Sequence, residues 1–166
     1  MIPAPETMVL RPTAEPDLNF VMRAERETEN RRFVGQWGRE RHREVIAGAD
    51  AAHMILERAE DERPVGFAIL RGLQGPDRCI EVKRLAVTEK GQGYGRAALR
   101  RIKALAFEEL GMHRLWLDVM ESNDRARALY ESEGFVFEGV MREHLKVGDG
   151  YESLVIMSIL EGEYGA

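Results

Sequence analysis

Residues 90–96 read Lys-Gly-Gln-Gly-Tyr-Gly-Arg, and this stretch decides how the rest of the chain is interpreted. An apolar run, Leu85–Val87, comes shortly before it, and an amphipathic helix pattern follows it. Glycine lacks a Cβ atom, so such a loop can turn sharply and a ligand can approach its backbone N–H groups. The first turn of the following helix adds unpaired N–H donors and the positive end of the helix dipole. The stretch therefore predicts an anion site, suited to a phosphate or pyrophosphate.

Other glycine motifs compete with this interpretation, and a plain glycine-rich turn between a strand and a helix is the simplest of them. A P-loop needs Lys-Ser or Lys-Thr after its glycines, and neither pair follows here. A Rossmann fingerprint is closer, because Gly93, Gly95 and Ala98 have the G-x-G-x-x-A spacing and Asp118 ends the next predicted strand. However, residues 88–92 separate these glycines from the strand, and too few βα units follow. The Rossmann interpretation, which would predict NAD(P) binding, is the minor alternative.

Length and composition indicate a single domain over residues 1–166, with residues 1–7 as a loose N-terminal segment. The chain is 44% hydrophobic and 32% charged, which is typical of a soluble globular protein. Its N-terminus lacks the basic and apolar regions of a signal peptide, and no apolar run reaches the length of a membrane span. The one cysteine, Cys79, excludes an internal disulfide. We therefore expect a cytoplasmic protein without a membrane partner.

The net charge of −5 argues against nucleic acid as the main partner. It is compatible with a cationic substrate, and equally with an acidic surface that is simply solvated.

The order of the predicted elements is β, α, α, β, β, β, loop, α, β, α, β, β. Strands are expected at 8–11, 53–60, 65–73, 78–87, 115–119, 135–147 and 151–160, and helices from residue 13, at 39–49, after the glycine loop up to 110, and at 125–133. This order predicts an α/β (α+β) domain with a mixed, mostly antiparallel sheet of about seven strands and helices on both faces. One right-handed crossover should make the strands at 78–87 and 115–119 parallel.

Two motifs in this order resemble the GNAT superfamily of acetyl-CoA-dependent N-acetyltransferases. The family carries Gln/Arg-x-x-Gly-x-Gly/Ala at the start of its central helix, and Lys90, Gly93 and Gly95 have that spacing. Lysine replaces the usual glutamine or arginine here, which keeps the positive charge of arginine. Further along, Asn123, Tyr130 and the pair Gly134-Phe135 resemble the C-terminal pattern of the family.

The two ends of the chain resemble, more loosely, the branch that acetylates the N-termini of ribosomal proteins. This resemblance rests on Leu10-Arg11-Pro12 before the first helix and on the closing hairpin.

The resemblance implies a binding site for acetyl-CoA, without a metal. Backbone N–H groups of the glycine loop would hold the pyrophosphate, and the strand before the loop would expose its backbone to the pantetheine arm. A backbone N–H near Leu85 would polarise the thioester carbonyl. The residues expected to bind the cofactor are Leu85, Ala86, Val87, Lys90, Gly91, Gln92, Gly93, Tyr94, Gly95, Arg96, Asn123 and Arg125.

The resemblance also implies a direct attack of an amine on the thioester, with Tyr130 as the general acid that protonates the leaving thiolate. For the general base, Glu81 and Glu121 are rival candidates. By the two-residue period of a strand, Glu81 and Lys83 should share one face with Leu85 and Val87.

The acceptor is expected to be a peptide or protein N-terminus, with a polyamine or an aminoglycoside as alternatives. Phe33 and Trp37 are the candidate residues for acceptor binding. A silent CoA-binding regulatory module is the alternative from another class, although Tyr130 argues against it. The oligomeric state stays open, with a homodimer as the candidate assembly.

Two further roles are rejected on the sequence. No histidine is placed beside Cys79, so we do not expect it to act as a ping-pong nucleophile. The four histidines lack the spacing of metal ligands. They are His42, His53, His113 and His144.

Overall fold

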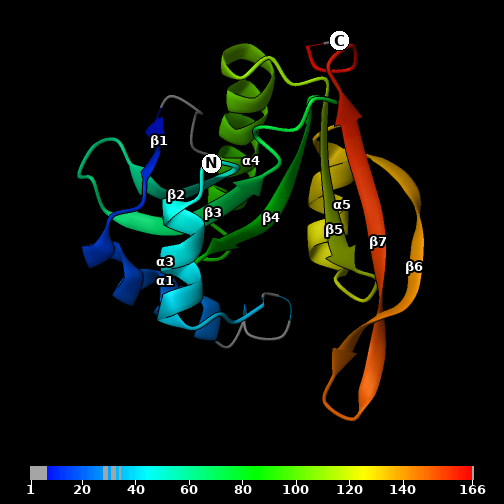
Figure 1. Cartoon of the computed structure of the whole chain (residues 1–166), viewed down its shortest axis with the longest axis horizontal. Helices are drawn as coiled ribbons and strands as arrows, with labels where there is room; N and C mark the ends of the chain where they lie inside the picture. Colours follow the sequence, from blue (N-terminus) through cyan, green and yellow to red (C-terminus); the bar gives the residue numbers. More distant parts are fainter. Residues whose placement is uncertain (1–6, 28–29, 31–32, 34, 166) are drawn as a thin grey trace.

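The computed structural model describes residues 7–27, 30, 33 and 35–165, and shows one twisted sheet with helices on both faces (Figure 1). The loose segment expected at residues 1–7 lies outside the described residues except for Thr7. The strands are β1 (Met8–Pro12), β2 (Ala51–Arg58), β3 (Pro64–Arg71), β4 (Cys79–Val87), β5 (Arg114–Met120), β6 (Val136–Val147) and β7 (Gly150–Leu160). The helices are α1 (Leu18–Arg26), α3 (Arg39–Ala47), α4 (Tyr94–Ala104) and α5 (Asp124–Ser132), with a 3-10 turn at Glu15–Asp17 and a π-helical turn at Leu105–Glu109.

The seven strands form one sheet in the order β1-β2-β3-β4-β5-β7-β6. Every neighbouring pair is antiparallel except β4 and β5, which run parallel because α4 crosses over between them. The predicted fold class, the crossover and the closing hairpin are therefore confirmed.

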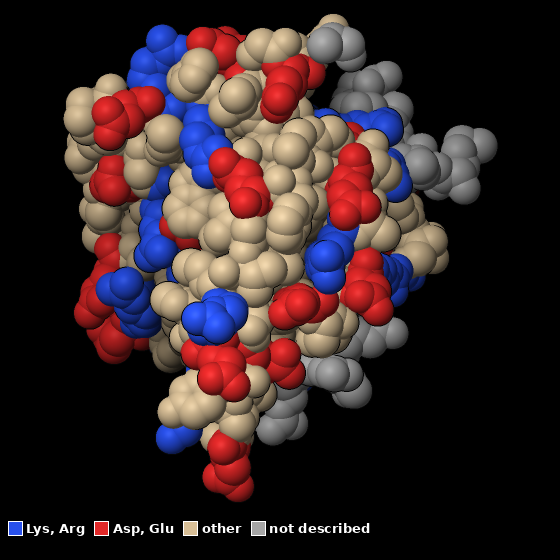
Figure 2. Space-filling view, turned by 90° about the vertical axis from the view of Figure 1, so that its right-hand side faces the viewer, with Lys and Arg blue, Asp and Glu red and all other residues tan. Residues whose placement is uncertain are grey.

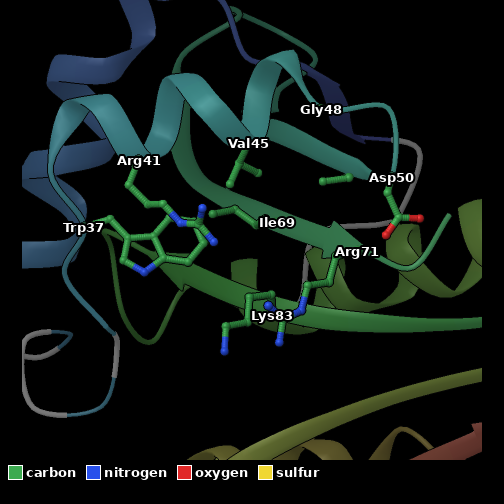
Figure 3. Close-up of a pocket in the computed structure, with 9 residues that line it drawn as sticks. Trp37, Arg41, Val45, Gly48, Asp50, Ile69, Arg71 and Lys83 are labelled. Atoms are coloured by element: carbon green, nitrogen blue, oxygen red, sulfur yellow. The ribbon is translucent and has the colours of Figure 1, made fainter. Parts of the chain in front are cut away.

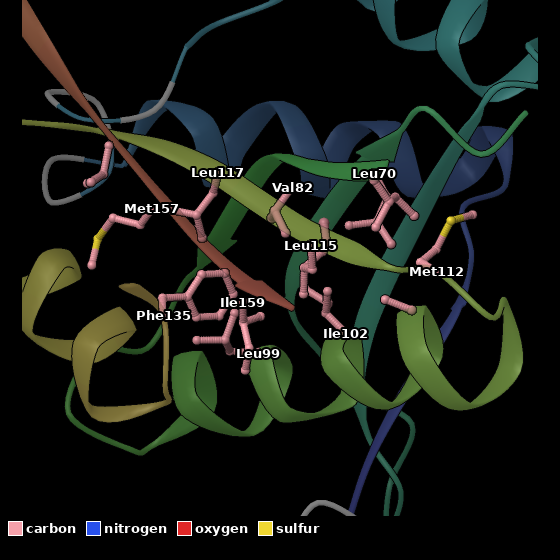
Figure 4. Close-up of a cluster of buried hydrophobic side chains, with 14 of the residues drawn as sticks. Leu70, Val82, Leu99, Ile102, Met112, Leu115, Leu117, Phe135, Met157 and Ile159 are labelled. Carbon is pink, nitrogen blue, oxygen red and sulfur yellow. The ribbon is translucent and has the colours of Figure 1, made fainter. Parts of the chain in front are cut away.

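The face of the sheet that carries α4 holds the larger hydrophobic core (Figure 4). Leu99 and Ile102 of α4 are fully buried against Leu115 and Leu117 of β5. Their burial agrees with the amphipathic helix pattern predicted after the glycine loop.

At the edge of this core, the buried carboxylate of Glu133 forms ion pairs with three cationic side chains of α4. Glu133 accepts hydrogen bonds from Arg100 and Lys103 at 3.0–3.1 Å and also pairs with Arg96. Burial alone would raise the pKa of Glu133, but the hydrogen bonds from Arg100, Arg96 and Lys103 outweigh it and lower the pKa to about 2. This cluster ties the end of α5 to α4.

The opposite face, covered by α1 and α3, contains a row of buried polar side chains, which we call the polar row: Thr13, His53, His42 and Glu25. The Oγ1 atom of Thr13 lies 2.8 Å from Nδ1 of His53, whose Nε2 lies 3.0 Å from Nδ1 of His42. The Nε2 atom of His42 lies 3.0 Å from Oε1 of Glu25. All four residues are at most 6% exposed. Burial, together with the neighbouring His42, lowers the pKa of His53 to about 4, so its ring is neutral at pH 7.

A β-bulge at Lys83 changes which face the side chains of β4 occupy. Ile69 of β3 pairs with Arg84, but Leu70 pairs with Val82, so Lys83 is the extra residue. Val82 and Leu85 therefore both pack toward the α4 face. The expectation that Glu81, Lys83, Leu85 and Val87 share one face is wrong, because the bulge interrupts the alternation.

The β6–β7 hairpin leaves several apolar side chains in solvent, and Figure 2 shows uncharged residues between acidic and basic ones on this side of the molecule. Phe137 and Tyr151 are more than half exposed. The homodimer stays a prediction. Within the described ranges, no helix has the length and apolar character needed to cross a membrane.

Candidate active site

The site is built where β4 and β5 separate. The two strands pair only at Cys79–Arg114, Ile80–Leu115 and Glu81–Trp116. Beyond Glu81 they diverge, and a cleft of about 1070 Å³ opens between them. Residues 82–85 of β4 line one wall of the cleft and residues 117–120 of β5 the other, with α5 beside them.

The glycine loop closes one end of this cleft. Gly91 and Gly93 have φ of 78° and 79°, a left-handed conformation that residues with a Cβ rarely adopt. Gly93 is the N-cap of α4 and has no side chain to satisfy the first N–H groups of the helix. These donors and the positive end of the α4 dipole therefore face the cleft, as an anion site requires.

Two charged side chains of the loop are already engaged within the protein. Lys90 donates from Nζ to Oδ1 of Asn30 at 2.6 Å, and Asn30 in turn donates to the carbonyl of Val87 at 3.0 Å. Arg96 is held by Glu133 and by Ser132. The loop consequently offers mainly its backbone to a ligand.

Tyr130 and Asp118 both line the cleft, one from α5 and the other from β5. Burial raises the pKa of Tyr130 to about 12, and the Asp118 carboxylate adds to the rise. Burial also raises the pKa of Asp118, against the opposing effect of Lys83. The cleft thus contains the protonated hydroxyl of Tyr130 and the desolvated carboxylate of Asp118.

Most of the residues expected to bind the cofactor line this cleft. They are Leu85, Val87, Lys90, Gly91, Gly93, Tyr94, Gly95, Arg96, Asn123 and Arg125. Ala86 is 2% exposed and packs on the opposite face with Ile69 and Phe67, while the side chain of Gln92 is exposed. Asn123 also caps α5, because its Oδ1 accepts from the N–H of Ala126 at 3.2 Å.

The two carboxylates expected to be rival bases lie elsewhere. Glu81 is 4% exposed and forms an ion pair with Arg71. Glu121 is exposed just after β5. Neither is among the residues that line the cleft, whereas Asp118 is.

The two residues expected to bind the acceptor lie at different hollows. Phe33 lines the cleft, while Trp37 lines a second, smaller pocket between α3 and the sheet. The guanidinium of Arg84 lies 4.8 Å from the centre of the Trp37 ring, and Gly35 passes so close to it that a Cβ there would be 2.1 Å from Nη2 of Arg84.

The sequence interpretation missed Asp118, Lys83 and Arg84 as site residues. Asp118 was considered only as a Rossmann marker, although a charge inside an otherwise apolar buried strand is a usable signal. The positions of Lys83 and Arg84 depend on the bulge in β4, which no sequence signal marks.

Comparison with known proteins agrees with this architecture. The profile of the acetyltransferase (GNAT) family matches residues 22–135. An uncharacterized N-acetyltransferase of Mycobacterium tuberculosis (strain ATCC 25618 / H37Rv) is 33% identical over 109 residues, which cover 65% of this chain and 67% of that protein. The ribosomal protein bS18 alanine N-acetyltransferase of Escherichia coli (strain K12) is 41% identical over 68 residues, covering 41% of this chain and 45% of the relative.

Among solved structures, the spermidine N-acetyltransferase of Vibrio cholerae in complex with CoA and spermine has the same fold. Its TM-score is 0.85 at 23% sequence identity, over 96% of this chain and 98% of that one. At this identity the likeness shows the fold alone. Together with the family match over most of the chain, it leads to one assignment: the chain belongs to the acetyltransferase (GNAT) family of acetyl-CoA-dependent N-acetyltransferases.

Proposed function

We propose that this chain transfers the acetyl group of acetyl-CoA to the α-amino group of a peptide or protein. The observation that carries the proposal is that Asp118 and Tyr130 line the same cleft, where β4 and β5 separate. Amine acylation needs a base for the attacking amine and an acid for the leaving thiolate, and a carboxylate and a phenol can fill these two roles.

Acetyl-CoA fits the cleft at the glycine loop. Gly91 and Gly93 leave the backbone uncovered, and the N-terminus of α4 supplies donors for the pyrophosphate. The exposed strand edge from Val82 to Leu85 would face the pantetheine arm. Bound there, acetyl-CoA supplies the thioester and the acetyl group.

Asp118 is our candidate for the base, in place of Glu81 and Glu121. Its carboxylate is desolvated and lies in the cleft, so an ammonium group that arrives there gains a partner and can give it a proton. An α-amino group, with an ordinary pKa of about 7.7–8.0, loses that proton far more readily than a lysine side chain at about 10.4.

Tyr130 is our candidate for the acid. Its hydroxyl carries a proton at neutral pH, burial raises its pKa further, to about 12, and it can donate that proton to the departing thiolate. Phe33 from the α1–α3 connection and Leu145 from the β6–β7 hairpin stand at the edge of the cleft, where the rest of the acceptor would lie.

A small amine such as spermidine is the second candidate acceptor. The acidic net charge of the chain supports it. Against it, Lys83 and Arg84 line the cleft beside Asp118, and they would repel the remaining charges of a polyamine.

The test is an acceptor panel with acetyl-CoA, in which product masses are measured. The panel contains an alanine-starting peptide, the same peptide with a blocked N-terminus and one lysine, spermidine and an aminoglycoside. We expect the free N-terminus to be acetylated fastest, and Asp118→Asn to lower kcat/KM while acetyl-CoA binding is retained. Faster acetylation of spermidine, the aminoglycoside or the blocked peptide would overturn the choice of acceptor. Binding of acetyl-CoA without transfer to any amine would point to a silent module.

A further inference from the structure

A second hollow opens on the α1–α3 side of the sheet, and we call it the Trp37 pocket (Figure 3). Its volume is about 180 Å³, and its walls come from the α1–α3 connection, α3, β3 and β4. The residues that matter here are Trp37, Arg41, Val45, Ile69, Arg71 and Lys83. Lys83 also lines the main cleft, so the two hollows meet at this side chain.

Positive charge dominates the Trp37 pocket. Arg41, Arg71 and Lys83 extend into it, and Figure 3 shows the ends of Arg71 and Lys83 side by side. The one carboxylate in its lining, Asp50, is occupied at the rim, where Oδ1 accepts a hydrogen bond from the N–H of Gln74 at 2.8 Å.

Two of these cations already have a carboxylate partner: Arg41 pairs through Nη1 with Glu44 at 3.0 Å on the exposed side of α3, and Arg71 pairs with Glu81. Arg71 uses Nε for its contact with Glu81, so its outer nitrogens remain for another acceptor. The Lys83 ammonium forms no hydrogen bond or ion pair with a described residue. Burial lowers the pKa of Lys83, and Arg71 and Arg84 lower it further against the opposing effect of Glu81 and Asp118. Burial and the two neighbouring guanidinium groups therefore outweigh the nearby carboxylates Glu81 and Asp118 at Lys83.

The aromatic wall of the pocket is fixed in place. The Trp37 ring has the guanidinium of Arg84 at 4.8 Å and that of Arg41 at 5.2 Å from its centre. Its backbone N–H donates to Oε2 of Glu25 at 3.2 Å. Val45 and Ile69 supply the apolar part of the lining. The pocket therefore combines rigid apolar walls with guanidinium groups, which suit a carboxylate on a short apolar stem.

We propose that the Trp37 pocket binds a carboxylate of the acceptor, so that the enzyme selects amines that also carry an acidic group. This inference rests on the proposed function, because it places the reacting amine at Asp118 and the carboxylate beyond Lys83. The carboxylate can come from an acidic side chain of a peptide or from the free C-terminus of a short one. A polycation would meet the positive charges of Arg41, Arg71 and Lys83 in the same place.

The experiment compares kcat/KM for matched acceptors with acetyl-CoA and the intact enzyme. Three peptides share an N-terminal alanine and differ at the second residue, which is Glu, Gln or Lys. A dipeptide with a free carboxylate and its C-terminal amide form the second arm, which separates the two sources of carboxylate. In one of the two arms, we expect kcat/KM to be at least about tenfold higher for the acceptor with the carboxylate than for its neutral counterpart. The difference would come from a charge-assisted hydrogen bond.

Two variants locate the preference. Arg41→Gln and Arg71→Gln should each bring the ratio of kcat/KM for acidic and neutral acceptors toward one. Arg78→Gln is the matched control, because Arg78 also pairs with a glutamate, Glu161, but lies outside both hollows. It should leave the ratio unchanged.

The outcomes separate this inference from the proposed function. Equal rates for acidic and neutral acceptors, or a preference for the Lys peptide, would overturn the carboxylate site while peptide acetylation stands. A preference that survives in both pocket variants would also overturn it. Absence of transfer to any α-amine would reject the proposed function and this inference together. The wild-type comparison needs no variant, so a folding defect in Arg71→Gln cannot obscure the result.

Discussion

The two faces of the sheet are built on different principles. Under α4 the core is apolar, and three cations of the helix gather at one edge of it around the buried carboxylate of Glu133. Under α1 and α3 the polar row from Thr13 to Glu25 lies inside the protein beside Phe67. The first face holds the glycine loop with hydrophobic packing, whereas on the second face the buried Glu25 of the polar row accepts a hydrogen bond from the backbone N–H of Trp37. This difference predicts distinct responses to mutation and to pH.

The largest effect should come from the cleft itself. We expect Tyr130→Phe to lower kcat by roughly 100-fold or more, because a positioned general acid contributes ~10²–10⁴. Affinity for acetyl-CoA, measured by calorimetry, should stay the same. Tyr164→Phe is the control, since the Tyr164 hydroxyl donates to Glu108 outside the cleft. An unchanged kcat in Tyr130→Phe would remove Tyr130 from this role.

The second prediction concerns the polar row and the pH range in which it changes the free energy of unfolding. The pKa of His53 is 6.5 in the unfolded chain and about 4 in the folded protein. Between these two pH values the imidazole is protonated in the unfolded chain but stays neutral in the folded protein. Stability is therefore lost as pH falls from about 6.5 to about 4, by about 3 kcal/mol in total. Denaturant unfolding at several pH values measures this loss. It should disappear in His53→Gln and persist in the variant of an exposed histidine, His113→Gln; equal slopes in both variants would contradict it.

The third prediction concerns the α4 face, whose contribution to the free energy of unfolding should change in a more acidic pH range. The pKa of Glu133 is lowered to about 2, so its contribution is complete above pH 4.5 and is lost as pH falls toward 2. We expect about 2 kcal/mol, allowing for the solvent exposure of its arginine partners. Glu133→Gln should lose this acid dependence but keep the pH dependence that comes from His53. If a single variant removes both pH dependences of stability, the two faces are coupled, which would contradict their separate roles.

The smallest effect is expected from the two glycine N-caps, one on each face of the sheet, when each is replaced by alanine. Gly93 caps α4 with φ of 79°, and Gly38 caps α3 with φ of −75°. Replacement by alanine removes a cap in both cases, but only Gly93→Ala adds left-handed strain of roughly 1–2 kcal/mol. Thermal unfolding should show the difference, and acetyl-CoA affinity should fall only for Gly93→Ala. Equal losses of stability would mean that the loop relaxes.

The sequence predicted the α4 face better than the other face, for a physical reason. Apolar periodicity and glycine spacing are local, so the α4 stripe, the loop and the crossover could be inferred. The pairing of Glu81 with Arg71, the polar row and the bulge at Lys83 depend on contacts between distant segments. Asp118 could have been recognised as a charge in an apolar strand, but its approach to Tyr130 needed the fold.

The short pairing of β4 with β5 has a mechanical consequence. The sheet consists of a four-stranded plate, β1 to β4, and a three-stranded plate, β5 to β7, joined along a seam of three residue pairs. Bending at that seam changes the width of the cleft while each plate keeps its internal ladder. The pairs at Cys79–Glu81 form the hinge at the closed end of the cleft, and the core under α4 packs across both plates.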